Sequence, residues 1–249
     1  AGIGGGEGGA GGNITINGGN VTATGNDKGA GIGGGYYGEG GTIKITGGTV
    51  TATGGNRAAG IGGGEGGAGG NITISGGTVE ATGKGSAKGI GGGTSGKDGT
   101  FYTDPNGSAF IIASSIGDNS EEKKGNWSGI IFDGNAGYVG GNQSAPPDLE
   151  IKGGQTLTIP DGSKLTINNG TTLTNNGTIQ IDQGGTLENN GTLTGSGTFT
   201  GDGEITGTKL TQATPNAGEG YAINCTTEQI TIESGYRISS DKSDTIADG

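Results

Sequence analysis

The sequence predicts an all-β fold, a single-stranded parallel β-helix (β-solenoid) in which one chain winds into stacked coils. Two observations carry this prediction: a glycine-rich motif recurs at a fixed period, and apolar and polar residues alternate within each period. The motif is AGIGGG at residues 1, 30 and 59 and KGIGGG at residue 88, a period of 29 residues. A fixed period of about 20 to 50 residues is typical of stacked repeat architectures.

Within the repeats, apolar residues fall into five columns separated by polar residues. The columns are Ile3/Ile32/Ile61/Ile90, Ile14/Ile43/Ile72/Phe101, Ile16/Ile45/Ile74, Val21/Val50/Val79 and Ala23/Ala52/Ala81. The alternation has a period of two, so each short strand turns one face inward. One copy cannot bury a core alone, but stacked copies place each column residue on the next at about 4.8 Å. We expect about three strands in each coil and a right-handed coil.

The glycines would suggest disorder if they were scattered, because the chain has 66 of them and is only 27% hydrophobic. Instead they recur at fixed places, such as the pairs Gly18-Gly19, Gly47-Gly48 and Gly76-Gly77 between predicted strands. Tight corners need positive φ, which glycine adopts at no steric cost. The glycines are therefore predicted to form corners and points of close approach.

The rhythm changes along the chain. After the 29-residue repeats of residues 1–100, residues 101–147 keep apolar strand-like runs around a polar excursion and are expected to form irregular coils. Over residues 148–208 Leu157, Leu165, Leu173 and Ile181 are eight apart, and Leu187, Leu193, Phe199 and Ile205 are six apart. These spacings predict shorter edges and a narrowing cross-section. We favour one continuous β-helix over residues 1–208, with residues 209–249 as C-terminal strands that cap it or begin another module.

Charge and composition exclude several classes of function. The net charge is −11, and residues 1–100 carry six acids and six bases, so the excess of acid lies in the remainder. Such a chain is a poor candidate for binding nucleic acid or an anionic membrane. No apolar run approaches the roughly 20 residues of a membrane span. We expect a monomer without an internal disulfide, since Cys225 is the only cysteine. Because Ala1 opens within a repeat, we expect a segment of a larger mature protein.

The glycine-rich repeats, followed by SGIIFDGNAG and LTIPDGSKLTINNGTTLTNNGTI, resemble a known type of protein. They are similar to the glycine-rich β-helical segments of large surface proteins of Gram-positive bacteria, which are described as adhesins or carbohydrate-binding proteins. The resemblance covers residues 1–208. It implies a secreted or cell-surface location and an extracellular glycan, or a host or cell-surface polymer, as partner. It assigns a role to no residue of this chain.

Aromatic side chains are the candidate ligand-binding residues. They are Tyr36, Tyr37, Tyr102, Trp127 and Tyr138. Exposed aromatic rings bind sugar faces well because they combine a flat apolar area with a polar rim. The alternative is that Trp127 packs beneath its loop and that the tyrosines cover exposed glycine backbone.

An enzyme is the first rival hypothesis, because a polysaccharide lyase or hydrolase also suits a β-helix. The best carboxylate cluster is Asp202 and Glu204, at i and i+2, with Glu188 upstream. A solvated acidic surface explains the same residues. Lyase chemistry usually uses a basic side chain, but neither Arg57 nor Arg237 has an acidic partner that the sequence reveals. The chain has no histidine and one cysteine, which excludes the common nucleophile–base pairs. We assign no catalytic residue.

Calcium and ice are the remaining alternatives. The run Asp118-Asn119-Ser120-Glu121-Glu122 offers oxygen ligands that suit calcium, the one cofactor considered, although we favour a solvated charged loop as its explanation. The rungs Thr22/Thr24, Thr51/Thr53 and Thr82 look like those of ice-binding solenoids, although Glu80 interrupts them. The function predicted is a non-catalytic segment of a secreted bacterial surface protein, a rigid stalk or adhesin with a carbohydrate-binding face near residues 36–138.

Overall fold

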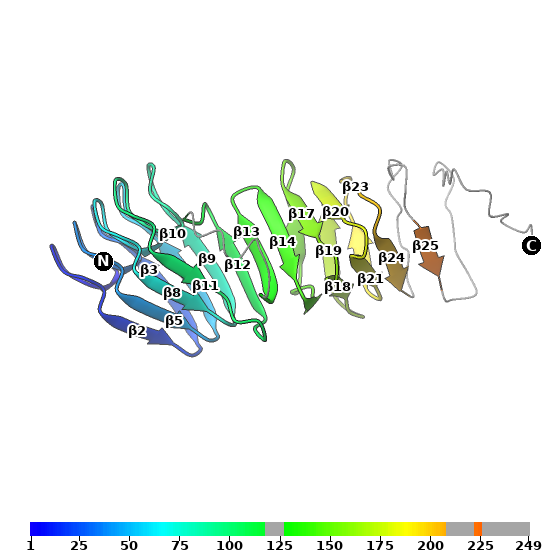
Figure 1. Ribbon diagram of the computed structural model, residues 1–249, viewed down its shortest axis with the longest axis horizontal. Helices are drawn as coiled ribbons and strands as arrows, with labels where there is room; N and C mark the ends of the chain where they lie inside the picture. The colour runs from blue at the N-terminus through cyan, green and yellow to red at the C-terminus, as the bar shows by residue number, and fades with distance from the viewer. Residues whose placement is uncertain (118–126, 208–221, 226–249) are drawn as a thin grey trace, which may run out of the picture. The chain divides into compact units, whose positions relative to one another are not determined.

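A computed structural model describes residues 1–117, 127–207 and 222–225, and the regular structure in these ranges is entirely β. The chain divides into two units, Ala1–Gly134 and Asn135–Gly249, and in each of them parallel strands wind into coils (Figure 1). The predicted parallel β-helix is therefore confirmed. In the described ranges no helix is long and apolar enough to cross a lipid bilayer.

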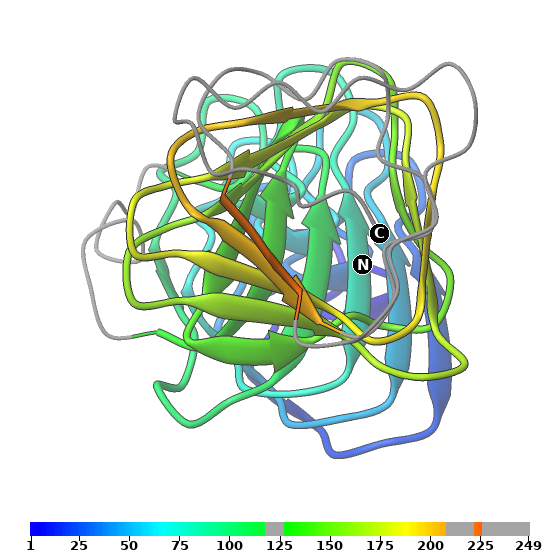
Figure 2. The same ribbon diagram turned by 90° about the vertical axis from the view of Figure 1, so that its right-hand side faces the viewer.

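Three parallel sheets make up the first unit, one for each strand of a coil. The first sheet contains β1 (Ile3–Gly4), β4 (Ile32–Gly33), β7 (Ile61–Gly62) and β10 (Ile90–Gly91). The second contains β2 (Asn13–Ile16), β5 (Thr42–Ile45), β8 (Asn71–Ile74) and β11 (Thr100–Tyr102). The third contains β3 (Asn20–Thr24), β6 (Thr49–Thr53), β9 (Thr78–Thr82), β12 (Ala109–Ala113) and β13 (Gly129–Asp133). In the blue-to-green part of Figure 2, strands of successive coils lie behind one another.

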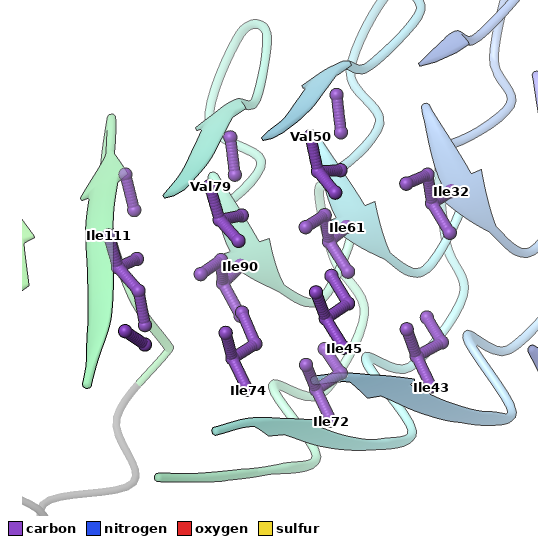
Figure 3. Close-up of a cluster of buried hydrophobic side chains, with 14 of the residues drawn as sticks. Ile32, Ile43, Ile45, Val50, Ile61, Ile72, Ile74, Val79, Ile90 and Ile111 are labelled. Carbon is purple, nitrogen blue, oxygen red and sulfur yellow. The ribbon is translucent and has the colours of Figure 1, made fainter. Parts of the chain in front are cut away.

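The core of this unit consists of the predicted columns, and the strand registers confirm all five. Ile14 pairs with Ile43, Ile43 with Ile72 and Ile72 with Phe101, one step per coil. The Val79 column continues to Ile111 in β12. Figure 3 shows these branched side chains in rows within the coil, and the labelled ones are at most 1% exposed. Each such burial stabilises the fold by about 1.5–3 kcal/mol.

The glycines act as predicted at the corners and contacts between coils. Gly19, Gly48 and Gly77 have φ values of 81°, 91° and 85°. At Gly64 a Cβ atom would overlap the carbonyl oxygen of Gly35 in the preceding coil. The glycine runs therefore let the backbone of one coil lie directly on the backbone of the next.

The strands of the second unit also form three faces of a coil, and these coils are shorter. One contains β14 (Ala136–Gly140), β17 (Thr156–Ile159), β20 (Thr178–Ile181) and β23 (Thr198–Thr200). Another contains β15 (Asn142–Ser144), β18 (Lys164–Ile167), β21 (Thr186–Asn189), β24 (Glu204–Gly207) and β25 (Ala222–Cys225). The third contains β16 (Leu149–Ile151), β19 (Thr172–Asn175) and β22 (Thr192–Thr194).

The eight- and six-residue spacings are edge lengths within a coil. Leu157 pairs with Ile179 and Ile179 pairs with Phe199, so these coil steps are 22 and 20 residues, against 29 in the first unit. Ile181 is an exception to the predicted rhythm because it shares β20 with Ile179. β25 extends the sheet by pairing in parallel with β24. Whether residues 1–208 form one continuous β-helix, and whether residues 209–249 cap it or begin a module, remain predictions.

Candidate functional site

Tyr36 and Tyr37 form the turn between β4 and β5, and the structure brings their rings together. The ring centroids are 3.9 Å apart with an interplanar angle of 32°. The two hydroxyls are hydrogen-bonded at 2.8 Å, and the interaction with Tyr36 raises the pKa of Tyr37 above its ordinary value of 10.0. Tyr37 is 65% exposed. The pair therefore presents a large aromatic surface to solvent, held in place by its own contacts.

The backbone at Tyr37 adopts a conformation that glycine usually supplies. Its φ is 57°, and the equivalent residues of the other coils are Gly8, Gly66 and Ser95, with φ values of 68°, 78° and 68°. A bulky residue in this left-handed region costs roughly 1–2 kcal/mol. Such strain concentrates at functional sites, so the outlier at Tyr37 motivates a functional hypothesis for this turn.

Lys28 lies against the tyrosine pair, and ion pairs connect it through Glu65 to Arg57. Lys28 Nζ lies 4.3 Å from the Tyr36 ring centroid, a cation–π distance. Glu65 is only 9% exposed. Its carboxylate forms ion pairs with Arg57 Nη1 at 2.7 Å and with Lys28 Nζ at 3.2 Å. The geometry at Oε2, which faces Lys28, is not that of a hydrogen bond. Glu65, followed by the Tyr36 hydroxyl, raises the pKa of Lys28 above its ordinary 10.5. We call Lys28, Tyr36, Tyr37, Arg57 and Glu65 the tyrosine–cation cluster.

Arg57 corrects the sequence interpretation, which found no acidic partner for it. Two turns flank each short strand of the first sheet, and hydrogen bonds between coils connect them: the Glu65 N–H donates to the Lys28 carbonyl at 2.9 Å, and the Thr94 N–H to the Arg57 carbonyl at 2.9 Å. These bonds hold the two columns of turns side by side. The ion pair of Arg57 with Glu65 then joins two residues that are eight apart in the same coil. The 29-residue period aligns Lys28 with Arg57 and Tyr36 with Glu65, but only the turn geometry makes these two columns neighbours.

The other three predicted ligand-binding residues lie elsewhere. Tyr102 is 50% exposed on the outer face of β11, where it pairs with Thr73. Trp127 is partly buried against the core of the first unit, as the packing alternative expects. Tyr138 is half-buried on β14, in the second unit. The site assignment of these residues remains a prediction.

Two members of the predicted carboxylate cluster lie on neighbouring strands, β21 and β24, but not opposite each other. Glu188 lies opposite Thr206, whereas Glu204 lies opposite Thr186. The Glu188 carboxylate instead accepts hydrogen bonds from Lys164 at 2.9 Å and Asn190 at 3.1 Å. Lys164, and then Asn190, lower the pKa of Glu188 below its ordinary 4.5. Glu188 is thus held as an anion, the opposite of what a general acid needs.

The structure also bears on the two remaining alternatives, metal binding and ice binding. In the part of the chain that the structure describes, no group of three or more His, Cys, Asp or Glu side chains is placed to hold a metal ion. The proposed calcium loop at residues 118–122, Arg237 and most of residues 209–249 lie outside the described residues. The threonine rungs are in register on β3, β6 and β9, but the column of Thr22 and Thr51 continues to Glu80 and then to Ile112.

The fold and these turns define a β-solenoid with a cluster of side chains displayed on its edge. Three stretches of the chain, residues 14–36, 43–65 and 72–94, match the model of a family described as Beta helix repeat. Each matched stretch ends at the column of Tyr36, Glu65 and Thr94, so the family pattern covers the strands and stops before Tyr37. No curated protein sequence and no solved structure matches this chain.

Proposed function

We propose that the chain is a rigid, non-catalytic segment of a secreted or cell-surface bacterial protein that binds an extracellular glycan at the tyrosine–cation cluster. The observation that carries this proposal is Tyr37, a ring 65% exposed and held at φ 57° where other coils have glycine or serine. The coil itself folds without an aromatic residue at this position. A strained, exposed tyrosine is therefore better explained by what it contacts outside the chain.

The turn is also preorganised for binding. Backbone hydrogen bonds link it to both neighbouring coils, from the Gly8 N–H to the Tyr36 carbonyl at 2.9 Å and from the Tyr37 N–H to the Glu65 carbonyl at 2.9 Å. The Tyr37 ring also lies over Gly66 of the next coil. A ring that is already ordered loses little entropy when a sugar stacks on it, which favours affinity. Stacked coils supply stiffness, so a stalk role is compatible with the same structure.

The proposal includes no reaction. Glu188, the carboxylate upstream of the predicted pair Asp202 and Glu204, is an ion-pair partner of Lys164. At the tyrosine–cation cluster the one carboxylate, Glu65, is nearly buried and paired with two cations. These contacts support binding rather than hydrolysis or elimination.

The test is retention of the full chain on a broad glycan array. Tyr37→Ser is the decisive variant, because Ser95 occupies the equivalent position in the fourth coil at φ 68° and the fold accepts serine there. We expect Tyr37→Ser to weaken binding about tenfold, the value of an aromatic stacking contact of about 1.4 kcal/mol. The control is Tyr102→Ser, another exposed tyrosine outside the cluster. If no glycan is retained, or if Tyr37→Ser binds like the parent chain, the adhesin proposal fails and the stalk role remains.

A further inference from the structure

A row of cations occupies successive turns of the coil and begins at Lys28, which lies beside Tyr36. Lys28, Arg57 and Lys84 occupy the segments that follow β3, β6 and β9 in three successive coils. The Lys84 N–H donates to the carbonyl of Ala58 at 3.2 Å, and the Arg57 side chain lies over Gly85, so the last two members belong to adjacent turns. Arg57 lies one period after Lys28, whereas Lys84 lies two residues before Ser86, the next equivalent position, so the row has one cation in each coil without strict register.

Acidic side chains offset this row unevenly. Asp27 and Glu65 neighbour Lys28 and Arg57, and Glu7 lies in the coil preceding Tyr36. The three cations therefore outnumber the two carboxylates beside them, Asp27 and Glu65. The excess of positive charge lies toward Arg57 and Lys84, at the end of the row away from Glu7. This excess stands out in a chain whose net charge is −11.

The Arg57 guanidinium retains donors for a ligand. Its ion pair with Glu65 uses Nη1, and its side chain is 51% exposed. A guanidinium carries five N–H donors, and the edge formed by Nε and Nη2 matches a carboxylate in a bidentate geometry. Arg57 also has a positive φ of 62°, so it shares the strained backbone seen at Tyr37.

We propose that the cluster is specific for an anionic polysaccharide that carries carboxylates on its sugar rings, a polyuronate-type polymer. This inference rests on the proposed glycan binding and deepens it. One sugar ring stacks on Tyr37, and the carboxylates of the polymer meet Arg57 and Lys84 along the coil axis. A polymer with one charge per sugar suits a row with one cation per coil, because neighbouring carboxylates can meet neighbouring cations.

Affinity electrophoresis of the full chain tests the proposal with matched polymers. The probes are polygalacturonate and alginate, each compared with its own carboxyl-esterified form, together with dextran sulfate. We expect retention by at least one carboxylated polymer that esterification weakens about tenfold or more, the value of one charge-assisted hydrogen bond of about 1.4 kcal/mol. Added salt should weaken the binding further.

Two charge variants assign the effect to the cation row. Arg57→Gln and Lys84→Gln, both at exposed positions, should each weaken retention by the carboxylated polymer, whereas Lys44→Gln, an equal charge change on the outer face of β5, should not. Equal retention of charged and esterified forms would overturn the inference and leave glycan binding intact. Equal retention by dextran sulfate would overturn the carboxylate specificity. If the chain binds none of these polymers and no glycan of the array, the proposal of glycan binding itself fails.

Discussion

Gly66 offers a direct measure of how the coil supports the tyrosine pair. Its φ is 78°, and a methyl group there would lie 2.5 Å from Tyr37 Cδ1, so Gly66→Ala must displace the ring. Gly8, the equivalent residue of the first coil, has φ 68° and nothing within 4 Å of the same methyl position. Gly8→Ala therefore reports the backbone cost alone, which is roughly 1–2 kcal/mol.

Gly66→Ala should cost more than Gly8→Ala by the lost contact of the two tyrosines, about 0.5–1.5 kcal/mol. The measurement is equilibrium urea unfolding of the full chain followed by circular dichroism, with the slope of the transition compared between variants. In a Tyr37→Ser background the extra cost of Gly66→Ala should vanish, because no ring remains to be displaced. Equal costs for Gly8→Ala and Gly66→Ala in the parent chain, or an extra cost that survives Tyr37→Ser, would refute this reasoning.

Two further predictions concern the core and the charged surface. Ile43→Ala removes three buried carbons from a fully buried column residue, so the free energy of unfolding should fall by about 3–4 kcal/mol. Lys44→Ala beside it should change this free energy by less than about 0.5 kcal/mol. Similar shifts of the urea midpoint in the two variants would contradict the stacked core. The pKa of Glu188 is lowered by Lys164 below 4.5, so this pair should stabilise the chain above that pH and lose its effect as the pH falls through the folded value. Thermal unfolding across this range should show the loss, and Glu188→Gln should remove it; an unchanged acid profile in that variant would argue against the ion pair.

The arrangement of the strands could be predicted in detail because the repeat is local and regular. A branched aliphatic residue every 29 positions, such as Ile14, Ile43 and Ile72, can exclude water only if it lies over its equivalents. Period-two alternation then settles which face of each strand points inward. In residues 148–208 the spacing predicted shorter edges correctly, but the position of Ile181 within a strand depended on where each turn falls.

The buried asparagines of the second unit were not predicted. Asn175 and Asn189 are at most 1% exposed at the ends of β19 and β21. Each side-chain oxygen accepts a hydrogen bond from the backbone N–H two residues later, at 3.2 Å from Gly177 and 3.1 Å from Gly191. An asparagine can close its own turn in this way, so its amide is satisfied while buried. Composition alone marks asparagine as a surface residue and misses this use.

The sequence by itself determined the coil, its period and the columns of the core, because burial of aliphatic side chains in register is a property of spacing. Only the tertiary structure decided which columns become neighbours across the turns, and so placed Arg57 and Lys28 on Glu65 beside Tyr36 and Tyr37. The physical reason is that such contacts join residues whose separations, 8 and 37 positions, do not follow the period. These contacts depend on the backbone path of two turns. Glycine allows many backbone conformations in a turn, and the hydrogen bonds and stacking between coils select one of them.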